Sequence, residues 1–279
     1  MWEVFVLNLK KERKVRMDLG LNGKVAVIFG GTTGIGAAAA MRFLEEGCQL
    51  AICSSSEKKV EGFRQQAETA GYSDILCEQV NAMVAEEVDA FAERVVKKFG
   101  RIDIWINCAG GNKHGPLATL PEETFRYIVD LNLSSVFFGI KAAARYMVPQ
   151  KSGVIISISS ISSKVPVDYR VTYGAVKAAV NVLTTGAASE LAPYGIRVNA
   201  VAPGIIDTVL SAKAIYEQTE YTMSRIPLRR AGKPEEVGDV IVCMASDRFS
   251  YVSGTVFQVD GGKDSVEDSD LPWVKPWTL

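Results

Sequence analysis

A tyrosine and a lysine four residues apart carry the clearest chemical signal in the sequence. They are Tyr173 and Lys177, in the run Thr-Tyr-Gly-Ala-Val-Lys. If this run is helical, the two side chains lie on one face, one turn apart. Unit charges about 4 Å apart interact by roughly 4 kcal/mol at an effective dielectric near 20, which corresponds to about three pKa units. We therefore expect Lys177 to lower the pKa of the Tyr173 phenol and make it a proton donor or acceptor for a substrate oxygen.

A glycine-rich turn lies upstream, directly after the apolar run Lys24–Gly30 (KVAVIFG). Glycines at the start of a helix let a pyrophosphate approach the backbone N–H groups and the positive end of the helix dipole. No Gly-Lys-Ser/Thr is present, so a P-loop nucleotidase is not supported. Contact with a dinucleotide is expected from Gly30, Thr32, Thr33, Gly34, Ile35 and Gly36.

The second predicted strand ends in three serines, Ser54, Ser55 and Ser56, with Lys58 and Lys59 behind them. The end of this strand commonly reads the adenosine ribose, where an acid suits the 2′-hydroxyl of NAD and hydroxyls or cations suit the 2′-phosphate of NADP. The run therefore favours NADP over NAD. The alternative is a solvated helix start capped by serine.

Composition narrows the class of protein. The chain has 279 residues, 48% hydrophobic and 23% charged, with a net charge of -1. This balance is typical of a soluble globular protein and argues against a nucleic-acid-binding surface. No apolar run approaches the roughly 20 residues that span a bilayer. Five cysteines without Cys-x-x-Cys spacing indicate reduced thiols in a cytoplasmic protein, and with one histidine a metal site is not expected.

Apolar runs alternate with helical patterns along the chain, which predicts α/β architecture: one doubly wound, Rossmann-type domain with a parallel seven-stranded sheet and helices on both faces. The expected strands are Lys24–Gly30, Gln49–Ser54, Ile75–Val80, Asp103–Cys108, Gly153–Ser160, Ile196–Ala202 and Thr255–Val259. The expected helices are Gly34–Gly47, Lys58–Ala70, Ala85–Phe99, Pro121–Met147, Tyr169–Pro193 and Pro234–Ala245.

The domain is expected to span residues 21–263. Residues 1–20, with a basic cluster after an apolar start, are expected to be a poorly ordered extension. Residues 205–233 mix helix and loop signals and are expected to form a substrate lid. Residues 264–279 form a tail whose tryptophans are expected to dock on the protein or on a neighbouring subunit, because exposed tryptophans are costly.

With these residues assembled, the chain resembles the short-chain dehydrogenase/reductase family over Leu21–Gly262. The motifs that carry the resemblance follow the family's order along the chain. They are Gly30-x-x-x-Gly34-x-Gly36, Asn107-Cys108-Ala109-Gly110, Asn132, Ser160, Tyr173, Lys177, Asn199, Pro203-Gly204 and Thr208.

The resemblance implies a role for each matched position. Tyr173 would be the acid/base, Lys177 would hold the nicotinamide ribose and lower the pKa of the tyrosine, Ser160 would bind the substrate oxygen, and Asn132 would help a water relay protons. The remaining positions would contact the cofactor. Asn107, Ala109 and Gly110 would line its adenosine side, Gln79, Val80 and Asn81 would lie near adenine, and Pro203, Gly204, Ile206 and Thr208 would approach nicotinamide.

Three positions depart from the family's pattern. Gln79 or Asn81 replaces the usual acid at the third strand end, Cys108 replaces a frequent asparagine, and Thr33 stands where many NADP-preferring members carry a basic residue. These departures bear on the choice of cofactor. They do not touch the residues expected to handle the proton.

Several of these positions have a plainer interpretation. Ser160 lies in SISSISS and is selected only by its distance from Tyr173. Asn132 is alternatively a buried polar kink, and His114 is alternatively a solvated loop residue rather than a substrate contact. Tyr169 is not a candidate, because no lysine follows it four residues later.

The resemblance implies hydride transfer between NAD(P) and a small-molecule ketone or secondary alcohol. A hydroxysteroid such as a bile acid is the first substrate expected, with a 3-oxoacyl thioester or a small polyol or sugar as alternatives. A catalytically inactive dinucleotide-binding scaffold is a remote alternative, since it would normally lack the tyrosine or the lysine. The family also implies a homotetramer built through Pro121–Met147 and Tyr169–Pro193.

Overall fold

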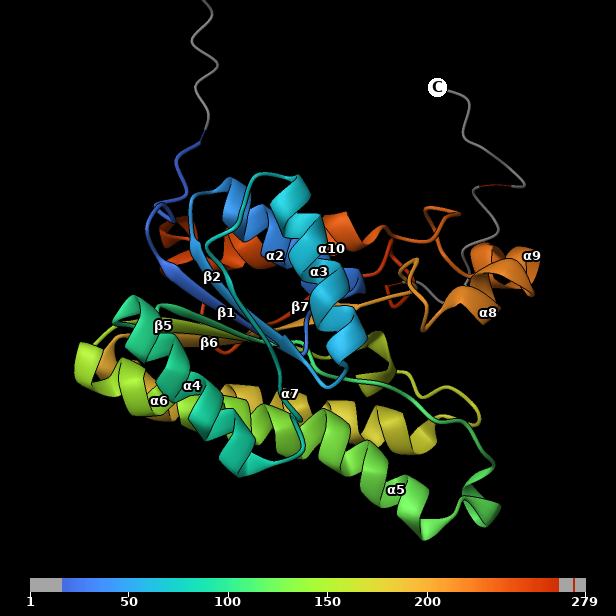
Figure 1. Ribbon diagram of the computed structural model, residues 1–279. Coiled ribbons are helices and arrows are strands. Elements are labelled where there is room, and N and C mark those ends of the chain that lie inside the picture. Colours follow the sequence, from blue (N-terminus) through green and yellow to red (C-terminus); the bar gives the residue numbers. More distant parts are fainter. Residues whose placement is uncertain (1–16, 266–272, 274–279) are drawn as a thin grey trace, which may run out of the picture.

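The computed structural model describes residues 17–265 and Trp273, and the first sixteen residues of the expected extension lie outside them. The predicted fold is confirmed: seven parallel strands form one sheet in the order β3-β2-β1-β4-β5-β6-β7 (Figure 1). The strands are β1 Val25–Phe29, β2 Gln49–Ser54, β3 Leu76–Gln79, β4 Ile104–Asn107, β5 Gly153–Ile158, β6 Ile196–Pro203 and β7 Val256–Val259.

Helices cover both faces of the sheet (Figure 1). Helices α2, α3 and α10 share one apolar core with Ala26 and Ile28, while α4, α6 and α7 share the other with Val25, Val27 and Phe29. All five residues of β1 are buried, as a strand covered on both faces requires. The longer helices are α2 Gly34–Glu45, α3 Glu57–Thr69, α4 Ala85–Phe99, α5 Glu122–Val129, α6 Ser135–Gln150, α7 Val171–Leu191 and α10 Pro234–Ala245.

The sheet order places the candidate site. Strand β1 pairs with β2 on one side and with β4 on the other, so the chain leaves β1 and β4 in opposite directions at their carboxyl ends. Ligands of open α/β sheets bind in the crevice that such a switch point creates. The glycine turn after β1 and the loop after β4 meet at this crevice.

Three predicted elements are corrected by the structure. The helix expected over Pro121–Met147 is interrupted by a π-helical turn, Asp130–Ser134, between α5 and α6. The helix expected from Tyr169 begins at Val171, because Tyr169 has a φ of 61° and a left-handed residue cannot continue a right-handed helix. The strand expected to reach Ser160 ends at Ile158, where the chain turns into a short 3-10 helix, η4 (Ile161–Ser163).

By length and composition alone, Glu122–Gln150 could pass for a membrane span, with a hydropathy of 1.2. Its place in the fold argues otherwise. Buried residues of α6, among them Val136 and Met147, pack in the core beneath the sheet, and 44% of the tested window is buried. The stretch also carries two glutamates in its first turn. It belongs to the helical layer of the domain.

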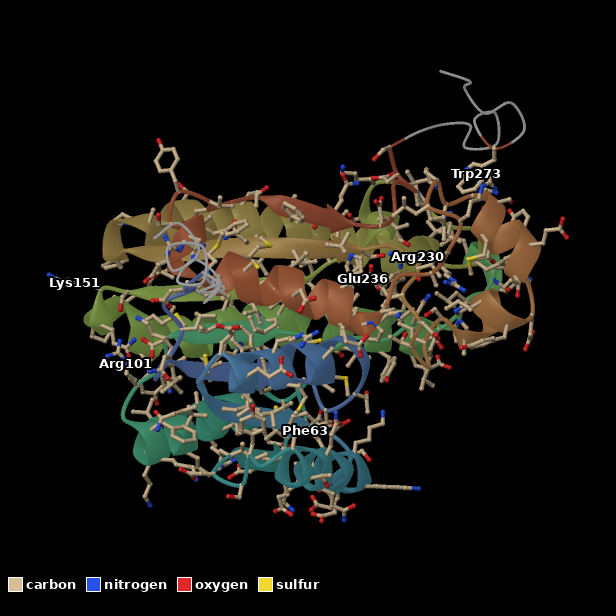
Figure 2. The ribbon with its side chains drawn as sticks, turned by 90° about the horizontal axis from the view of Figure 1, so that it is seen from above. Phe63, Arg101, Lys151, Arg230, Glu236 and Trp273 are labelled. Carbon is tan, nitrogen blue, oxygen red and sulfur yellow. The ribbon has the colours of Figure 1, made fainter. Side chains whose placement is uncertain are left out.

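Two short helices, α8 Ala212–Tyr216 and α9 Thr219–Ser224, form the segment expected as a lid. The end of this segment is tied to α10, since Arg230 and Glu236 face each other at 2.7 Å (Figure 2). Trp273 docks on the same segment: its Nε1 donates to the Pro227 carbonyl at 3.1 Å, and the Arg229 guanidinium lies 5.5 Å from its ring. Trp273 thus contacts this segment while remaining 59% exposed. Apart from Trp273, the tail beyond residue 265 falls outside the described residues, so its docking stays a prediction.

The close approach of α6 to β4 depends on Gly139. Asn107 is buried at the end of β4, where its amide oxygen accepts from Trp105 Nε1 at 2.7 Å and its nitrogen donates to Ser157 Oγ at 3.2 Å. A Cβ on Gly139 would overlap the Asn107 oxygen and lie 2.8 Å from Trp105 Nε1. The Asn107 amide therefore lies in the core under α6, and the expected contact of this residue with the cofactor would come from its backbone.

We expect Gly139→Ala to destabilise the protein by about 1–3 kcal/mol, the usual cost of overpacking a filled core. Gly62→Ala on α3 is the matched control, because no atom lies within 4 Å of its added Cβ. The control should gain up to about 1 kcal/mol through helix propensity. Urea unfolding measures both changes, and equal stabilities of the two variants would contradict this packing.

Candidate active site

The predicted catalytic side chains converge at the carboxyl ends of β4 and β5. Lys177, 2% exposed on α7, donates from Nζ to the carbonyl of Ile158 at 2.8 Å. Its ammonium lies 5.7 Å from the centre of the Tyr173 ring, and Ser160 lies near enough to Tyr173 to act on the pKa of its phenol. A Cβ built on Gly110 would lie 3.1 Å from Asn132 Oδ1 and 3.6 Å from Lys177 Nζ. All four residues therefore surround one point next to the loop after β4.

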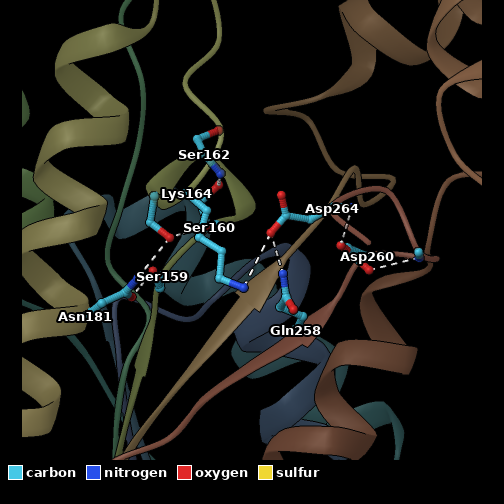
Figure 3. Close-up of polar contacts among 10 residues, drawn as sticks. Ser159, Ser160, Ser162, Lys164, Asn181, Gln258, Asp260 and Asp264 are labelled. Atoms are coloured by element: carbon cyan, nitrogen blue, oxygen red, sulfur yellow. Dashed lines mark hydrogen bonds and ion pairs between the residues drawn. The ribbon is translucent and has the colours of Figure 1, made fainter. Parts of the chain in front are cut away.

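Local hydrogen bonds hold Ser160 in place (Figure 3). Its Oγ accepts from the backbone N–H of Ser162 at 3.1 Å as the cap of η4. Its neighbour Ser159 donates to Asn181 Oδ1 at 2.5 Å, and Asn181 Nδ2 donates to Ser163 Oγ at 2.9 Å. The turn that carries Ser160 is thereby fixed to α7, the helix that carries Tyr173.

The expected effect of Lys177 on Tyr173 is not what the structure shows. The pKa of Tyr173 is raised above its ordinary value, because burial disfavours the phenolate, and the hydrogen bond from Ser160 and the charge of Arg170 offset this only in part. The ammonium of Lys177 faces the Ile158 carbonyl instead. Tyr173 is consequently a neutral phenol that can donate its proton.

Burial shifts the pKa of Lys177 in the opposite direction, because it disfavours the charged ammonium. Desolvation lowers the pKa of its ammonium to about 8, and no carboxylate among the described residues forms an ion pair with it. The neighbouring Cys108 is a buried thiol whose pKa is raised to about 11. All five cysteines are free, and no cluster of possible metal ligands occurs among the described residues.

Asn132 lies in the π-helical turn between α5 and α6 and is fully buried. Its Nδ2 donates to the carbonyls of Gly111 and Ile128 at 2.9 and 3.0 Å, and its Oδ1 accepts from the Gly111 N–H at 3.2 Å. The structure therefore shows the second interpretation of this residue, the buried polar kink, while its part in a proton relay stays a prediction. It is a buried polar side chain in a helix interruption, and it fixes the loop that lines the site.

The backbone of the glycine turn is packed so closely on its neighbours that a side chain at Gly30 or Gly36 would not fit. Gly30 has a φ of 82° and packs so closely on Ala109 that a Cβ would overlap it. Gly36 abuts Gly31 in the same way, which brings α2 against β1. Gly34, with a φ of 57°, opens α2 beneath Thr208. Backbone N–H groups at an open helix start suit a pyrophosphate, so the residues present fit a dinucleotide.

The other residues of this turn lie at different depths. Thr33 precedes α2 and is exposed, without a capping hydrogen bond from its side chain. Thr32 is buried and Ile35 packs partly on the core. The turn therefore offers backbone more than side chains to a ligand.

Strand pairing brings the serine run next to the third strand end. Ser54 pairs with Gln79, whose Nε2 donates to the Ser55 carbonyl at 3.0 Å, and Val80 N donates to the Ser54 carbonyl at 2.9 Å. Asn81 is engaged by the Met83 N–H and by the Glu87 carboxylate. Ser56 precedes α3 without making a side-chain cap, so the capping alternative for this serine is not supported. The serine hydroxyls remain available to a ligand.

The expected nicotinamide side lies beyond β6. Pro203 ends the strand, and Gly204 packs against Asp260. Thr208 lines a cavity of about 460 Å³ together with Gly34, Asp207, Tyr216 and others. Ile206, expected to contact the cofactor, is only 5% exposed and packs in the core, so its side chain does not reach the crevice.

Sequence reasoning missed three supporting groups. The Ile158 carbonyl that binds Lys177 has no sequence signal, since any residue supplies a carbonyl. Asn181 follows Lys177 by one helical turn, and that spacing could have pointed to it. Asp264, buried beyond β7, contacts Gln258 at 2.5 Å and Lys164 at 3.6 Å, which ties the turn after Ser160 to the end of the domain (Figure 3).

Known proteins are similar to this chain over most of its length. The family model described as enoyl-(acyl carrier protein) reductase matches residues 30–264. The 3-oxoacyl-[acyl-carrier-protein] reductase FabG of Thermotoga maritima is 38% identical, over 87% of this chain and 98% of the relative. A 3alpha-hydroxysteroid dehydrogenase of Mediterraneibacter gnavus is 36% identical, over 89% and 100%.

Solved structures agree with these relatives. A short-chain type dehydrogenase/reductase from Mycobacterium marinum has a TM-score of 0.85 and 32% identity, over 89% of this chain and 98% of that one. A levodione reductase has a TM-score of 0.82 and 30% identity, over 88% and 99%.

The buried Lys177 makes stability depend on pH in a defined direction. Its pKa is lowered from 10.5 to about 8 in the folded protein, so between these values the unfolded chain binds the extra proton and stability rises with pH. Relative to Lys177→Met, the wild type should gain about 3 kcal/mol across this window, at 1.36 kcal/mol per pKa unit. Denaturant unfolding at pH 7 and pH 10 measures the difference. A difference that stays constant with pH would show that Lys177 is not desolvated.

Proposed function

The chain belongs to the short-chain dehydrogenase/reductase family, and from this premise we propose that it interconverts a ketone and a secondary alcohol with NADP as its cofactor. The observation that carries the proposal is that Tyr173 lies beside the buried ammonium of Lys177, with Ser160 near enough to act on the pKa of its phenol. These groups lie at the crevice where the glycine turn meets the loop after β4. The cofactor, when bound, supplies or accepts the hydride.

Tyr173 and Ser160 handle the oxygen of the substrate. Because burial keeps Tyr173 protonated, its hydroxyl can donate to the alkoxide that develops when a ketone is reduced. Ser160 Oγ accepts from the Ser162 N–H, so its own proton, which acts on Tyr173 in the absence of substrate, can be donated to the same substrate oxygen. Two donors aimed at one developing negative charge stabilise the transition state more than the ground state.

We propose that Lys177 helps to replace the proton that Tyr173 donates and contacts the ribose of the cofactor, and that Asn132 fixes the loop that lines the cofactor site. The Lys177 ammonium is held at the Ile158 carbonyl on the side of Tyr173, where it can also reach ribose hydroxyls. Asn132 fixes the backbone of Gly111 on both its N–H and its carbonyl. With a pKa of about 8, Lys177 is close enough to neutral pH to exchange protons with water.

NADP is favoured over NAD by the end of β2. Ser54, Ser55 and Ser56 present hydroxyls there, and Lys58 and Lys59 are exposed one turn further. No acid occupies the strand end to accept from a free 2′-hydroxyl. A 2′-phosphate would be met by donors and positive charge.

The substrate class is proposed from the printed names of two similar proteins. A steroid ketone or alcohol, as the hydroxysteroid relative's name indicates, is proposed first. A 3-oxoacyl thioester is the second candidate, favoured by the relative named a 3-oxoacyl-[acyl-carrier-protein] reductase at nearly the same identity. A panel of ketones from both classes, each with NADPH and NADH, separates them.

We also propose a cytoplasmic homotetramer assembled through α5, α6 and α7. These helices leave large apolar side chains in solvent in the single chain: Phe137 is 50% exposed and Val182 is 73% exposed. Apolar surface of this kind is typical of a protein interface. Light scattering that returned a monomer would contradict the assembly.

Tyr173→Phe tests the chemistry. The variant keeps the ring but loses the proton, so turnover should fall at least about a hundredfold, the lower end of general acid catalysis, with nucleotide affinity retained. Tyr169→Phe is the matched control, because Tyr169 is 63% exposed. Steady-state oxidation of NADPH with the best ketone measures both. Near wild-type turnover in Tyr173→Phe would refute the proposed acid.

Ser54→Asp tests the choice of nucleotide. A carboxylate at the end of β2 repels a 2′-phosphate and accepts from a 2′-hydroxyl, so the dissociation constant for NADPH should rise at least about tenfold, or 1.4 kcal/mol, while that for NADH does not. Ser54→Asn is the uncharged control. Fluorescence titration with both nucleotides measures the constants. Equal affinity of the wild type for NADH and NADPH would overturn the preference for NADP.

A further inference from the structure

A hydrogen-bonded bridge crosses from the loop after β4 to the start of α7. Arg170, which directly precedes α7, donates from Nε to His114 Nδ1 at 3.3 Å. The other ring nitrogen of His114 lies 3.5 Å from Asn112 Nδ2. All three residues follow the carboxyl end of β4 or precede Tyr173 by a few positions, so they lie at the substrate side of the crevice.

The guanidinium of Arg170 lacks the partner that a half-buried cation needs. Within the part of the chain that the structure describes, no carboxylate pairs with Arg170, and its two terminal nitrogens make no hydrogen bond. Burial lowers the pKa of this guanidinium, and the interaction with Tyr173 offsets that effect only in part. An arginine in this condition costs stability unless an anion completes it.

The neighbouring groups strengthen the positive character of this place. Lys113, on the loop that carries His114, adds a second cation, with its ammonium 4.4 Å from the centre of the Tyr127 ring. The charge of Arg170 also acts on the phenol of Tyr173 and favours its ionisation. Arg170 is thus near enough to the reacting oxygen for one substrate to touch both.

A purely structural role does not account for Arg170. The same two segments are already joined by the backbone, since the Gly115 N–H donates to the Tyr169 carbonyl at 3.0 Å. Tyr169 holds a left-handed φ of 61° there, a strained conformation of a kind that clusters at functional sites. The backbone bond closes the loop, and the arginine leaves two N–H₂ groups in the fork geometry that binds a carboxylate or phosphate at two points.

We propose that Arg170, held by His114, binds an anionic group of the substrate, a carboxylate or a phosphate, beside the carbon–oxygen bond that Tyr173 serves. The inference rests on the proposed function in one respect: it assumes that the substrate lies next to Tyr173. It narrows the substrate class, because a neutral steroid or a simple neutral ketone would leave Arg170 unpaired. A steroid carboxylic acid and a phosphate-bearing acyl thioester both satisfy it.

Two matched pairs of ketones test the anion and its source. One is dehydrocholate with its methyl ester, and the other is acetoacetyl coenzyme A with the acetoacetyl thioester of N-acetylcysteamine, which lacks the phosphates. Binding is measured by calorimetry in the presence of NADP⁺, where a ketone cannot be reduced. Turnover with NADPH is measured separately, so a failure of the proposed reaction leaves the binding result intact. The proteins are the wild type, Arg170→Gln, Arg170→Lys and the control Arg126→Gln, whose ion pair with Glu122 is exposed.

In at least one pair, the wild type should bind the charged member about ten- to a hundredfold more tightly, the range of a hydrogen bond to a charged group. Arg170→Gln should abolish this difference and leave the neutral member unchanged, Arg170→Lys should retain part of it, and Arg126→Gln should retain all of it. The proposal is overturned if the wild type does not discriminate in either pair, or if discrimination persists in Arg170→Gln. Equal weakening of both members in Arg170→Gln also overturns it, since that result marks a structural bridge.

Discussion

The arrangement of the site depends on one buried hydrogen bond, from the Lys177 ammonium to the Ile158 carbonyl at 2.8 Å. It joins the last residue of β5 to the second turn of α7, and the serine turn and the tyrosine lie on either side of it. A desolvated ammonium without a carboxylate is costly, so the surrounding packing has to hold it there. The bond also fixes the end of β5, directly before the turn that carries Ser160, against the helix that carries Tyr173.

Much of the fold and the position of the site could be predicted from local patterns. The apolar run of β1 and its glycines require a buried strand followed by an open helix start, and both are present. The spacing of Tyr173 and Lys177 correctly placed them on one helix. The pKa of Tyr173 could not be predicted in this way, because spacing gives the distance to a charge but not the burial of the phenol, and burial dominates.

Two asparagines show why the direction of a side chain could not be predicted from the sequence. Asn107 and Asn132 both belong to motifs near the crevice. The first turns into the core, where Trp105 and Ser157 bind its amide, while the second binds the loop backbone beside Lys177. Which way each faces is decided by a neighbour distant in sequence, such as Gly139 on α6. Neither composition nor periodicity contains that information.

The π-helical turn at Asp130–Ser134 has a consequence for the two helices that it joins. A turn closed by an i→i+5 bond holds one residue more than an α-helical turn, and one residue corresponds to about 100° of rotation at 3.6 residues per turn. The apolar stripe of α5 is therefore out of phase with that of α6. The same segment can present one side to the crevice and another to the sheet without a break in the chain. A deletion of one residue here would bring the stripes back into phase and withdraw Asn132 from the loop.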